Sequence, residues 1–143
     1  MKISLGVLMD PIQHIKFYKD STFAMLLEAQ RRGWNIWYME QADVVLKDNR
    51  VVAQAEHLAV IDQDEGWFEF GESREIQLAD LDVILMRKDP PFDMQYIYTT
   101  YLLELSGCLI VNNAQALRDA NEKLSTAWFP QCCTPTLVAS QAQ

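Results

Sequence analysis

The feature that most constrains the fold is a nearly continuous apolar run, Ile3–Met9, near the start of the chain. A strand of this composition is buried on both faces, which is typical of a parallel sheet. Asp20 and Ser21 then supply N-cap chemistry for a helix that Gly33 ends, and a second strand is predicted at residues 35–40. Because strand–helix–strand units are right-handed and place their strands parallel, this part of the chain predicts an α/β fold.

A second strand–helix–strand unit is predicted later in the chain. Residues 82–86 form another apolar strand, Asp93 is a suitable N-cap, and residues 108–111 return as a strand. Six apolar residues recur between them with helical spacing: Met94, Ile97, Tyr98, Tyr101, Leu102 and Leu105. This is the best amphipathic match in the chain, so we expect this stripe to face the core.

The segment between the two units changes character. Residues 44–46 and 51–53 are predicted as two strands around the polar turn 47–50, and residues 58–61 and 67–70 add further β-structure. We therefore expect an antiparallel β insertion lying against the main sheet, with a register that the sequence leaves open. The fold class predicted from these elements is α/β, a Rossmann-like three-layer domain with a parallel core sheet.

Beyond the second unit, the sequence predicts three further elements. A short helix is expected at residues 114–119, another helix at 121–128, and the start of a strand at 136–138. No internal repeat is visible, so the elements do not belong to a solenoid.

The net charge of −8 limits the classes of partner. An acidic chain repels nucleic-acid phosphates and anionic lipid surfaces, so we expect no nucleic acid and no membrane as partners. No apolar run approaches the roughly 20 residues that cross a bilayer, and the N-terminus does not resemble a signal peptide. Three cysteines without framework spacing suggest reduced thiols, which favours a cytoplasmic location. Cys132 and Cys133 lack CxxC or HxxxH partners, so no metal site is expected.

Ligands of open parallel sheets bind at the carboxyl ends of the strands. Three such ends can be located, at residues 10–11, 87–93 and 112–113. The middle one is the most informative, because Pro90 and Pro91 stiffen a loop that also carries charged side chains.

That loop begins with Arg87, Lys88 and Asp89. Arginine pairs with carboxylates through two parallel hydrogen bonds, so the loop could hold a small carboxylate substrate. An internal ion pair between Arg87 and Asp89 that merely braces the sheet edge is an equally good interpretation of the same residues.

Two weaker candidates remain. The helix start at Asp20 and Ser21 offers free N–H groups to an anion, although a simple N-cap is the favoured interpretation. Lys123 on its own is typical of solvated surface, and His14 and His57 are assigned no role. There is no GxGxxG after the first strand, no GxxxxGK[ST] phosphate loop and no GxSxG elbow. The residues alone therefore predict a ligand-binding α/β domain without visible catalytic residues.

Three stretches carry a family resemblance. They are GVLMDP (6–11) with KDSTFAMLLEAQRRG (19–33), LDVILMRKDPPFD (81–93) and LRDANEKLSTAWF (117–129). The chain resembles the N-terminal, pre-ATP-grasp domain of bacterial glutathione synthetases. The resemblance implies an ATP-grasp carboxylate–amine ligase that uses ATP and Mg²⁺ to join γ-glutamylcysteine and glycine through an acyl phosphate.

The resemblance also implies a division of the chain. Residues 1–120 would form the pre-ATP-grasp substrate domain and residues 121–143 the truncated start of the ATP-grasp domain. The metal ligands and most of the ATP site of the family would lie beyond residue 143, so this chain alone is expected to be inactive. The family assembles as an oligomer, which implies a homo-oligomer, with residues 92–101 and 67–70 as candidate contacts.

By similarity, the residues that would face the dipeptide substrate are Asp20, Ser21, Arg87, Lys88, Asp89 and Pro90. Lys123 would be the first of two ATP-grasp lysines that reach the nucleotide phosphates. No catalytic residue and no metal ligand is assigned within the chain. Two alternatives stay open: the N-terminal domain of another ATP-grasp carboxylate–amine ligase, and a non-catalytic Rossmann-like binding or oligomerisation module.

Overall fold

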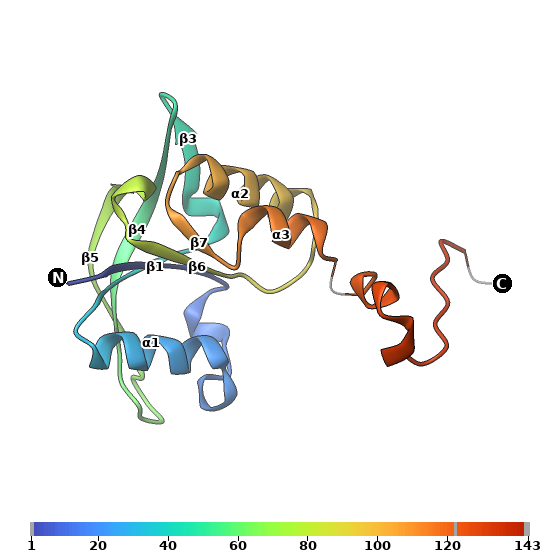
Figure 1. The fold of residues 1–143 in the computed structure, drawn as a ribbon. Helices are drawn as coiled ribbons and strands as arrows, with labels where there is room; N and C mark the ends of the chain where they lie inside the picture. Colours follow the sequence, from blue (N-terminus) through green and yellow to red (C-terminus); the bar gives the residue numbers. More distant parts are fainter. Residues whose placement is uncertain (1, 122, 142–143) are drawn as a thin grey trace.

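The computed structural model describes residues 2–121 and 123–141, and its centre is a seven-stranded sheet with helices on both faces (Figure 1). Helix α1 (Ser21–Arg31) covers one face, whereas α2 (Met94–Leu105) and α3 (Ala114–Asp119) cover the other. This is the predicted α/β architecture of three layers. None of the helices in the described part of the chain has both the length and the apolar character needed to cross a membrane.

Four strands form the parallel part of the sheet, in the order β2-β1-β6-β7. Their bounds are Ser4–Met9 for β1, Asn35–Met39 for β2, Val83–Arg87 for β6 and Leu109–Val111 for β7. Helix α1 connects β1 to β2 and α2 connects β6 to β7, so both predicted strand–helix–strand units are confirmed. A Cβ at Gly6 would lie 2.8 Å from Leu81 Cδ1, so a larger residue at this position of β1 would have to displace the Leu81 side chain.

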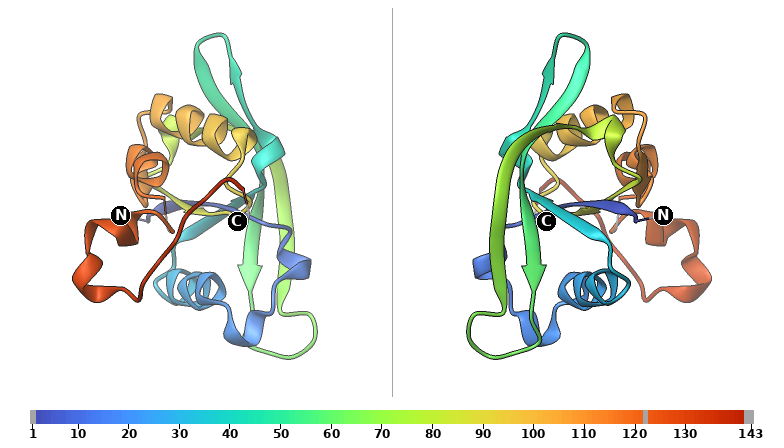
Figure 2. Two further views of the ribbon diagram at one scale, coloured as in Figure 1. Left: turned by 90° about the vertical axis from the view of Figure 1, so that its right-hand side faces the viewer. Right: turned by 90° about the vertical axis from the view of Figure 1, so that its left-hand side faces the viewer.

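The β insertion contains β3 (Val44–Lys47), β4 (Arg50–Val60) and β5 (Phe68–Gln77). Two residues with left-handed backbone, Asp48 and Asn49, form the predicted tight turn between β3 and β4. The predicted antiparallel insertion is confirmed, and it continues the main sheet at its edge, because β4 pairs antiparallel with β2. An outer strand presents unpaired N–H and C=O groups, and β4 satisfies those of β2. In Figure 2, β4 and β5 form a long curved ribbon beside the parallel strands.

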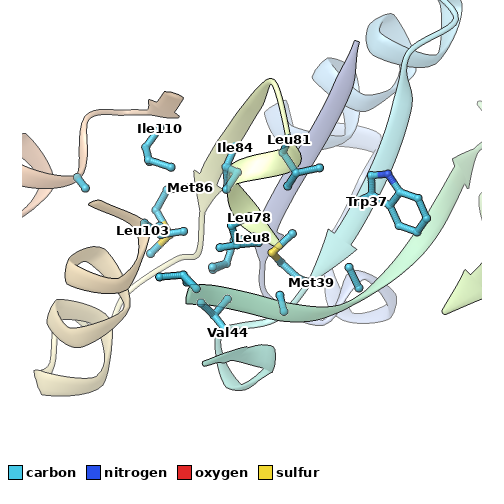
Figure 3. Packing of buried hydrophobic residues seen from close by; sticks show 14 of the residues in the cluster. Leu8, Trp37, Met39, Val44, Leu78, Leu81, Ile84, Met86, Leu103 and Ile110 are labelled. Atoms are coloured by element: carbon cyan, nitrogen blue, oxygen red, sulfur yellow. The ribbon is translucent and has the colours of Figure 1, made fainter. Parts of the chain in front are cut away.

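The sheet separates two hydrophobic clusters, because alternate side chains of each strand point to opposite faces. On the α1 side, Leu5 and Val7 pack with Phe23 and Leu26 of the helix. On the α2 side the cluster includes Leu8, Met39, Ile84, Met86 and Leu103 (Figure 3).

The inner face of α2 differs from the prediction. The residues that face the sheet are Tyr96, Thr99, Thr100 and Leu103. Most of the predicted stripe is exposed instead, including Met94, Tyr98, Tyr101 and Leu105. The inner hydroxyls are tolerated because they bond within the helix: Thr99 Oγ1 lies 2.9 Å from Gln95 O, and Thr100 Oγ1 lies 2.7 Å from Ile97 O.

The segment after α3 lacks two of the predicted elements. In place of a helix at 121–128, the described residues form a 3₁₀ helix at Ser125–Trp128 and another at Pro130–Cys132. Glu122 lies outside the described residues. The described residues 136–138 belong to no strand, since no neighbouring strand pairs with them. Short helices need tertiary packing, and Trp128 and Phe129 are exposed, so little supports a longer helix here.

Candidate functional site

Two cavities open where β1 and β6 end, and Pro90 lines both. We call the first the α2 cavity; its volume is about 450 Å³. It is lined by Lys88, Pro90, Phe92, Tyr96, Leu117, Ala120, Asn121 and Lys123. The second, the crossover cavity, has about 490 Å³ and adjoins the segment between β1 and α1. It is lined by Asp10, His14, Ile15, Lys16, Lys19, Asp20, Asp89 and Pro90.

Asp10, the first residue after β1, fixes the loop that follows β6. Its Oδ1 forms an ion pair with Lys88 Nζ at 2.8 Å, and its Oδ2 accepts a hydrogen bond of 2.9 Å from Asp89 N. Lys88 Nζ also donates to Asp89 O, and only 15% of the Lys88 side chain is exposed. The sequence had located this strand end but had given Asp10 no role in the site.

Arg87 lines neither cavity. Its Nε donates to Thr22 Oγ1 and its Nη2 to Ser21 Oγ, both at 2.9 Å. The guanidinium therefore braces the first turn of α1 against the end of β6. The alternative bracing interpretation was right about the role and wrong about the partner, since Arg87 forms no ion pair with Asp89 among the described residues.

The start of α1 has the geometry of a simple N-cap. Asp20 Oδ1 accepts a hydrogen bond of 2.9 Å from Phe23 N, as the favoured interpretation predicted. Asp20 also lines the crossover cavity, whereas the Ser21 hydroxyl is engaged by Arg87. The structure thus brings Asp20, Asp89 and Pro90 together in one cavity.

The α2 cavity gathers the other predicted residues, Lys88, Pro90 and Lys123. Asn121 Oδ1 accepts hydrogen bonds from Lys123 N and Leu124 N, both at 3.0 Å, which fixes the backbone that carries Lys123. The opposite wall is aromatic, with the rings of Phe92 and Tyr96 5.4 Å apart. Burial raises the pKa of the Tyr96 phenol, so this side chain stays neutral at physiological pH.

Three residues of the crossover cavity were missed as site candidates: His14, Lys16 and Lys19. The available signal was their position in a polar segment that directly follows a strand's carboxyl end. Two contacts shape this segment. Lys19 N donates to Lys16 O at 3.0 Å, and the Tyr38 hydroxyl accepts a bond from Ile12 N at 3.3 Å. Burial and a hydrogen bond to Glu40 raise the pKa of Tyr38, so this hydroxyl keeps its proton.

The side chains of the two cavities suit a charged organic ligand better than a metal ion. No group of three or more His, Cys, Asp or Glu side chains that could hold a metal ion occurs in residues 2–121 and 123–141. The two cavities instead combine ammonium groups, carboxylates and an aromatic wall, which suit a small charged organic ligand.

Comparison with known proteins gives consistent matches. Residues 3–118 match the family described as prokaryotic glutathione synthetase, N-terminal domain. A glutathione synthetase of Salmonella typhimurium is 57% identical over 139 residues, which cover 95% of this chain and 44% of the relative. Those of Pseudomonas putida and Vibrio vulnificus are 53% and 51% identical and are covered to 45% and 46%. The chain therefore spans less than half the length of these relatives.

Proposed function

The chain belongs to the family of prokaryotic glutathione synthetase N-terminal domains, and from this premise we propose that it is the substrate-binding part of an ATP-dependent ligase. The ligase would join γ-glutamylcysteine and glycine to form glutathione. The observation that carries the proposal is the family match over residues 3–118. The position of both cavities at the carboxyl edge of the parallel strands supports it, because ligands of such sheets bind there.

The dipeptide would lie along the loop Lys88–Pro90, between the two cavities. Lys88 and Asp89 are held by Asp10, so the loop is ordered before a ligand binds. Arg87 and Ser21 would act indirectly, because their hydrogen bond ties the start of α1 to this loop. This changes the part that Arg87 plays in the proposal from gripping a carboxylate to positioning the loop.

ATP would bind on the side of the α2 cavity, where it would activate the cysteinyl carboxylate as an acyl phosphate for attack by glycine. Lys88, Lys123 and the Asn121 amide supply the donors that suit a phosphate group. Since the described residues gather no metal-binding group, Mg²⁺ is assigned no ligand in this part of the chain. Because the chain spans less than half the length of the ligases that it matches, we propose that it does not make glutathione by itself. We place the enzyme in the cytoplasm.

We further propose that the protein is a homo-oligomer and that the outer face of α2 contacts a second copy. Met94, Tyr98, Tyr101 and Leu105 form an exposed, uncharged stripe along this helix. The other candidate segment, residues 67–70, packs internally, with the Trp67 ring stacked on Phe17 at 5.1 Å. In sedimentation experiments, Y98S/L105S should shift the protein towards monomer and M25S on α1 should not. Equal self-association of all forms would refute this contact.

A binding experiment tests the substrate role. In an NMR titration of the 143-residue chain with γ-glutamylcysteine, shifts should concentrate at the residues that line the two cavities. Lys88→Gln should weaken binding by about ten-fold, because a charge-assisted hydrogen bond is lost. Lys47→Gln is the matched control, since Lys47 makes an exposed ion pair with Glu75 on the β3–β4 hairpin. Unchanged binding in K88Q, or no binding at all, would favour a non-catalytic module.

An activity assay tests the rest of the proposal. The purified chain, supplied with ATP, Mg²⁺, γ-glutamylcysteine and glycine, should form no glutathione above the rate without protein. Detection of glutathione would refute the proposal that this part of the chain needs the remainder of the ligase for turnover.

A further inference from the structure

The crossover cavity holds charges of both signs on different walls. Lys16 and Lys19 lie on the segment between β1 and α1 and form no ion pair with any residue that the structure describes. Asp89 lies on the opposite loop, and its carboxylate has no hydrogen-bond partner among the described side chains and backbone groups. Two cations and a carboxylate are therefore available to a ligand inside one cavity.

The α2 cavity has a different chemistry. Its described lining residues include Lys88 and Lys123 but no carboxylate, and much of its wall is apolar. An ammonium group would find no carboxylate partner in its lining, whereas an anion would find donors in either cavity. Of the two cavities at the carboxyl edge of the parallel strands, the crossover cavity offers, among the described residues, partners for a positive and a negative group at once.

We propose that the crossover cavity binds the zwitterionic α-amino-acid end of the peptide substrate. Lys16 and Lys19 bind its α-carboxylate, and Asp89 accepts hydrogen bonds from its α-ammonium group. The identity of the peptide rests on the proposed function, whereas the choice of cavity and of these three residues rests on the charges of the cavity. Its volume of about 490 Å³ is within the range of small-molecule sites.

Both walls are ordered by contacts outside the cavity. The hydrogen bond from Lys19 N to Lys16 O makes one tight turn of the lysine wall, and Tyr38 holds the start of that segment at Ile12 N. On the other wall, Asp10 accepts the Asp89 N–H, and Pro90 follows directly. Binding therefore orders only the ends of three side chains, which limits its entropic penalty.

This placement predicts that the cavity prefers a γ-linked peptide. In γ-glutamylcysteine the α-ammonium and α-carboxylate groups share one carbon atom, so both fit a single two-signed cavity. In the α-linked isomer that carboxylate forms the peptide bond, and the free one sits at the end of the side chain. With the γ-glutamyl end in the crossover cavity, the cysteinyl carboxylate points past Pro90 towards the α2 cavity and Lys123.

The first test removes the two cations. The K16Q/K19Q chain should bind γ-glutamylcysteine about ten-fold more weakly than the unmodified chain in an NMR or calorimetric titration under reducing conditions. The matched control is K47Q/R50Q, which removes the same charge from a separate cavity beside the β3–β4 hairpin and should bind normally. Equal weakening in both double variants would assign the effect to net charge and overturn the proposal.

The second test measures the contact between the α-ammonium group of the peptide and Asp89. The unmodified chain should prefer γ-glutamylcysteine over its Nα-acetyl form, and D89N should lose most of that preference, about ten-fold. A change in folding would weaken both peptides alike and leave their ratio intact. A ratio that D89N leaves unchanged would therefore contradict the assignment of Asp89.

The outcomes separate this inference from the function on which it rests. Binding that shifts only residues of the α2 cavity, and that K16Q/K19Q leaves unchanged, overturns the inference and leaves the substrate role standing. Binding of the α- and γ-linked isomers with equal strength has the same meaning. Absence of shifts at both cavities overturns the inference together with the proposed function.

Discussion

Helices α1 and α2 pack on opposite faces of one sheet, but they bury different kinds of side chain. Helix α1 buries Phe23, Leu26 and Ala29, and its outer face carries the charged residues Glu28 and Arg31. Helix α2 buries hydroxyl-bearing residues around Leu103 and presents an apolar stripe outwards. Helix α1 thus turns its apolar face towards the core, whereas α2 turns much of its apolar surface towards solvent.

The difference shows that a helix can meet a core with polar side chains when their hydrogen bonds are made locally. Thr99 and Thr100 donate to carbonyls of their own helix, and Ser106 Oγ donates to Leu103 O. No buried side-chain nitrogen or oxygen among the described residues lacks a hydrogen-bond partner. The exposed side chains of α2 consequently contribute little to the packing of the core, which is consistent with the proposed contact with a second copy.

The largest expected effect distinguishes the two faces of α2. Leu103 is fully buried, whereas 66% of Leu105 is exposed. Leu103→Ala should lower the free energy of unfolding by about 2–5 kcal/mol, through lost burial and a residual cavity, and Leu105→Ala by less than about 0.5 kcal/mol. Urea unfolding of the monomeric protein measures both. Equal losses would mean that the face assigned to the core is wrong.

A smaller effect is expected from the side chains that tie each helix to its surroundings. Gln30 on α1 bonds both backbone groups of Val60, with Nε2 2.6 Å from the carbonyl and Oε1 2.8 Å from the nitrogen. Gln30→Ala should lower the free energy of unfolding by about 1–3 kcal/mol, because two partly buried backbone groups lose their partner. On the α2 side, Gln41→Ala removes one bond, to Thr99 Oγ1, and should lower it by about 1 kcal/mol or less. The reverse order would contradict this account of how α1 is anchored.

Removal of the N-cap side chain should destabilise the protein to a similar extent at α1 and at α2. Asp20 accepts a hydrogen bond from Phe23 N and Asp93 accepts one from Tyr96 N, at 2.9 and 2.8 Å. Asp20→Ala and Asp93→Ala should therefore each lower the free energy of unfolding by about 1 kcal/mol. The matched serine variants, which keep a capping oxygen, should recover most of that loss. A cap whose serine variant unfolds as easily as its alanine variant is not acting through this hydrogen bond.

Local signals in the sequence predicted the elements well. The caps at Asp20 and Asp93, the left-handed Gly33 and the apolar strands predicted both strand–helix–strand units without knowledge of tertiary contacts. The face of α2 could not be predicted in the same way. A prediction from helical periodicity places apolar residues such as Tyr98 and Leu105 in the core and threonines on the surface. It does not take into account that a threonine hydroxyl can be buried when it donates a hydrogen bond to a carbonyl of its own helix.

The site shows a similar division. The location of the candidate site was predicted from the topology, because parallel strands end at a common edge. The roles of neighbouring residues did not follow, since Arg87 contacts α1 whereas Lys88 lines the α2 cavity. The partners of Arg87 come from a helix about 65 positions earlier in the chain, a distance that no motif spacing encodes. The sequence therefore predicted the position of the loop but not which partner each of its side chains contacts.

The smallest effect is expected on the outer face of α1, where Glu28 accepts hydrogen bonds from Arg31 and Arg32. These bonds, that of Arg31 first, lower the pKa of Glu28 from its usual 4.5 to about 2. Because the folded-state pKa is the lower one, the stabilisation is present above pH 4.5 and is lost as the pH falls towards 2. All three side chains are exposed, so Glu28→Gln should change the unfolding midpoint little, and added salt should reduce even that change. An NMR titration of the Glu28 carboxyl in the folded protein measures the shift directly. A midpoint near 4.5 would show that the ion pairs with Arg31 and Arg32 do not order the charged face of α1.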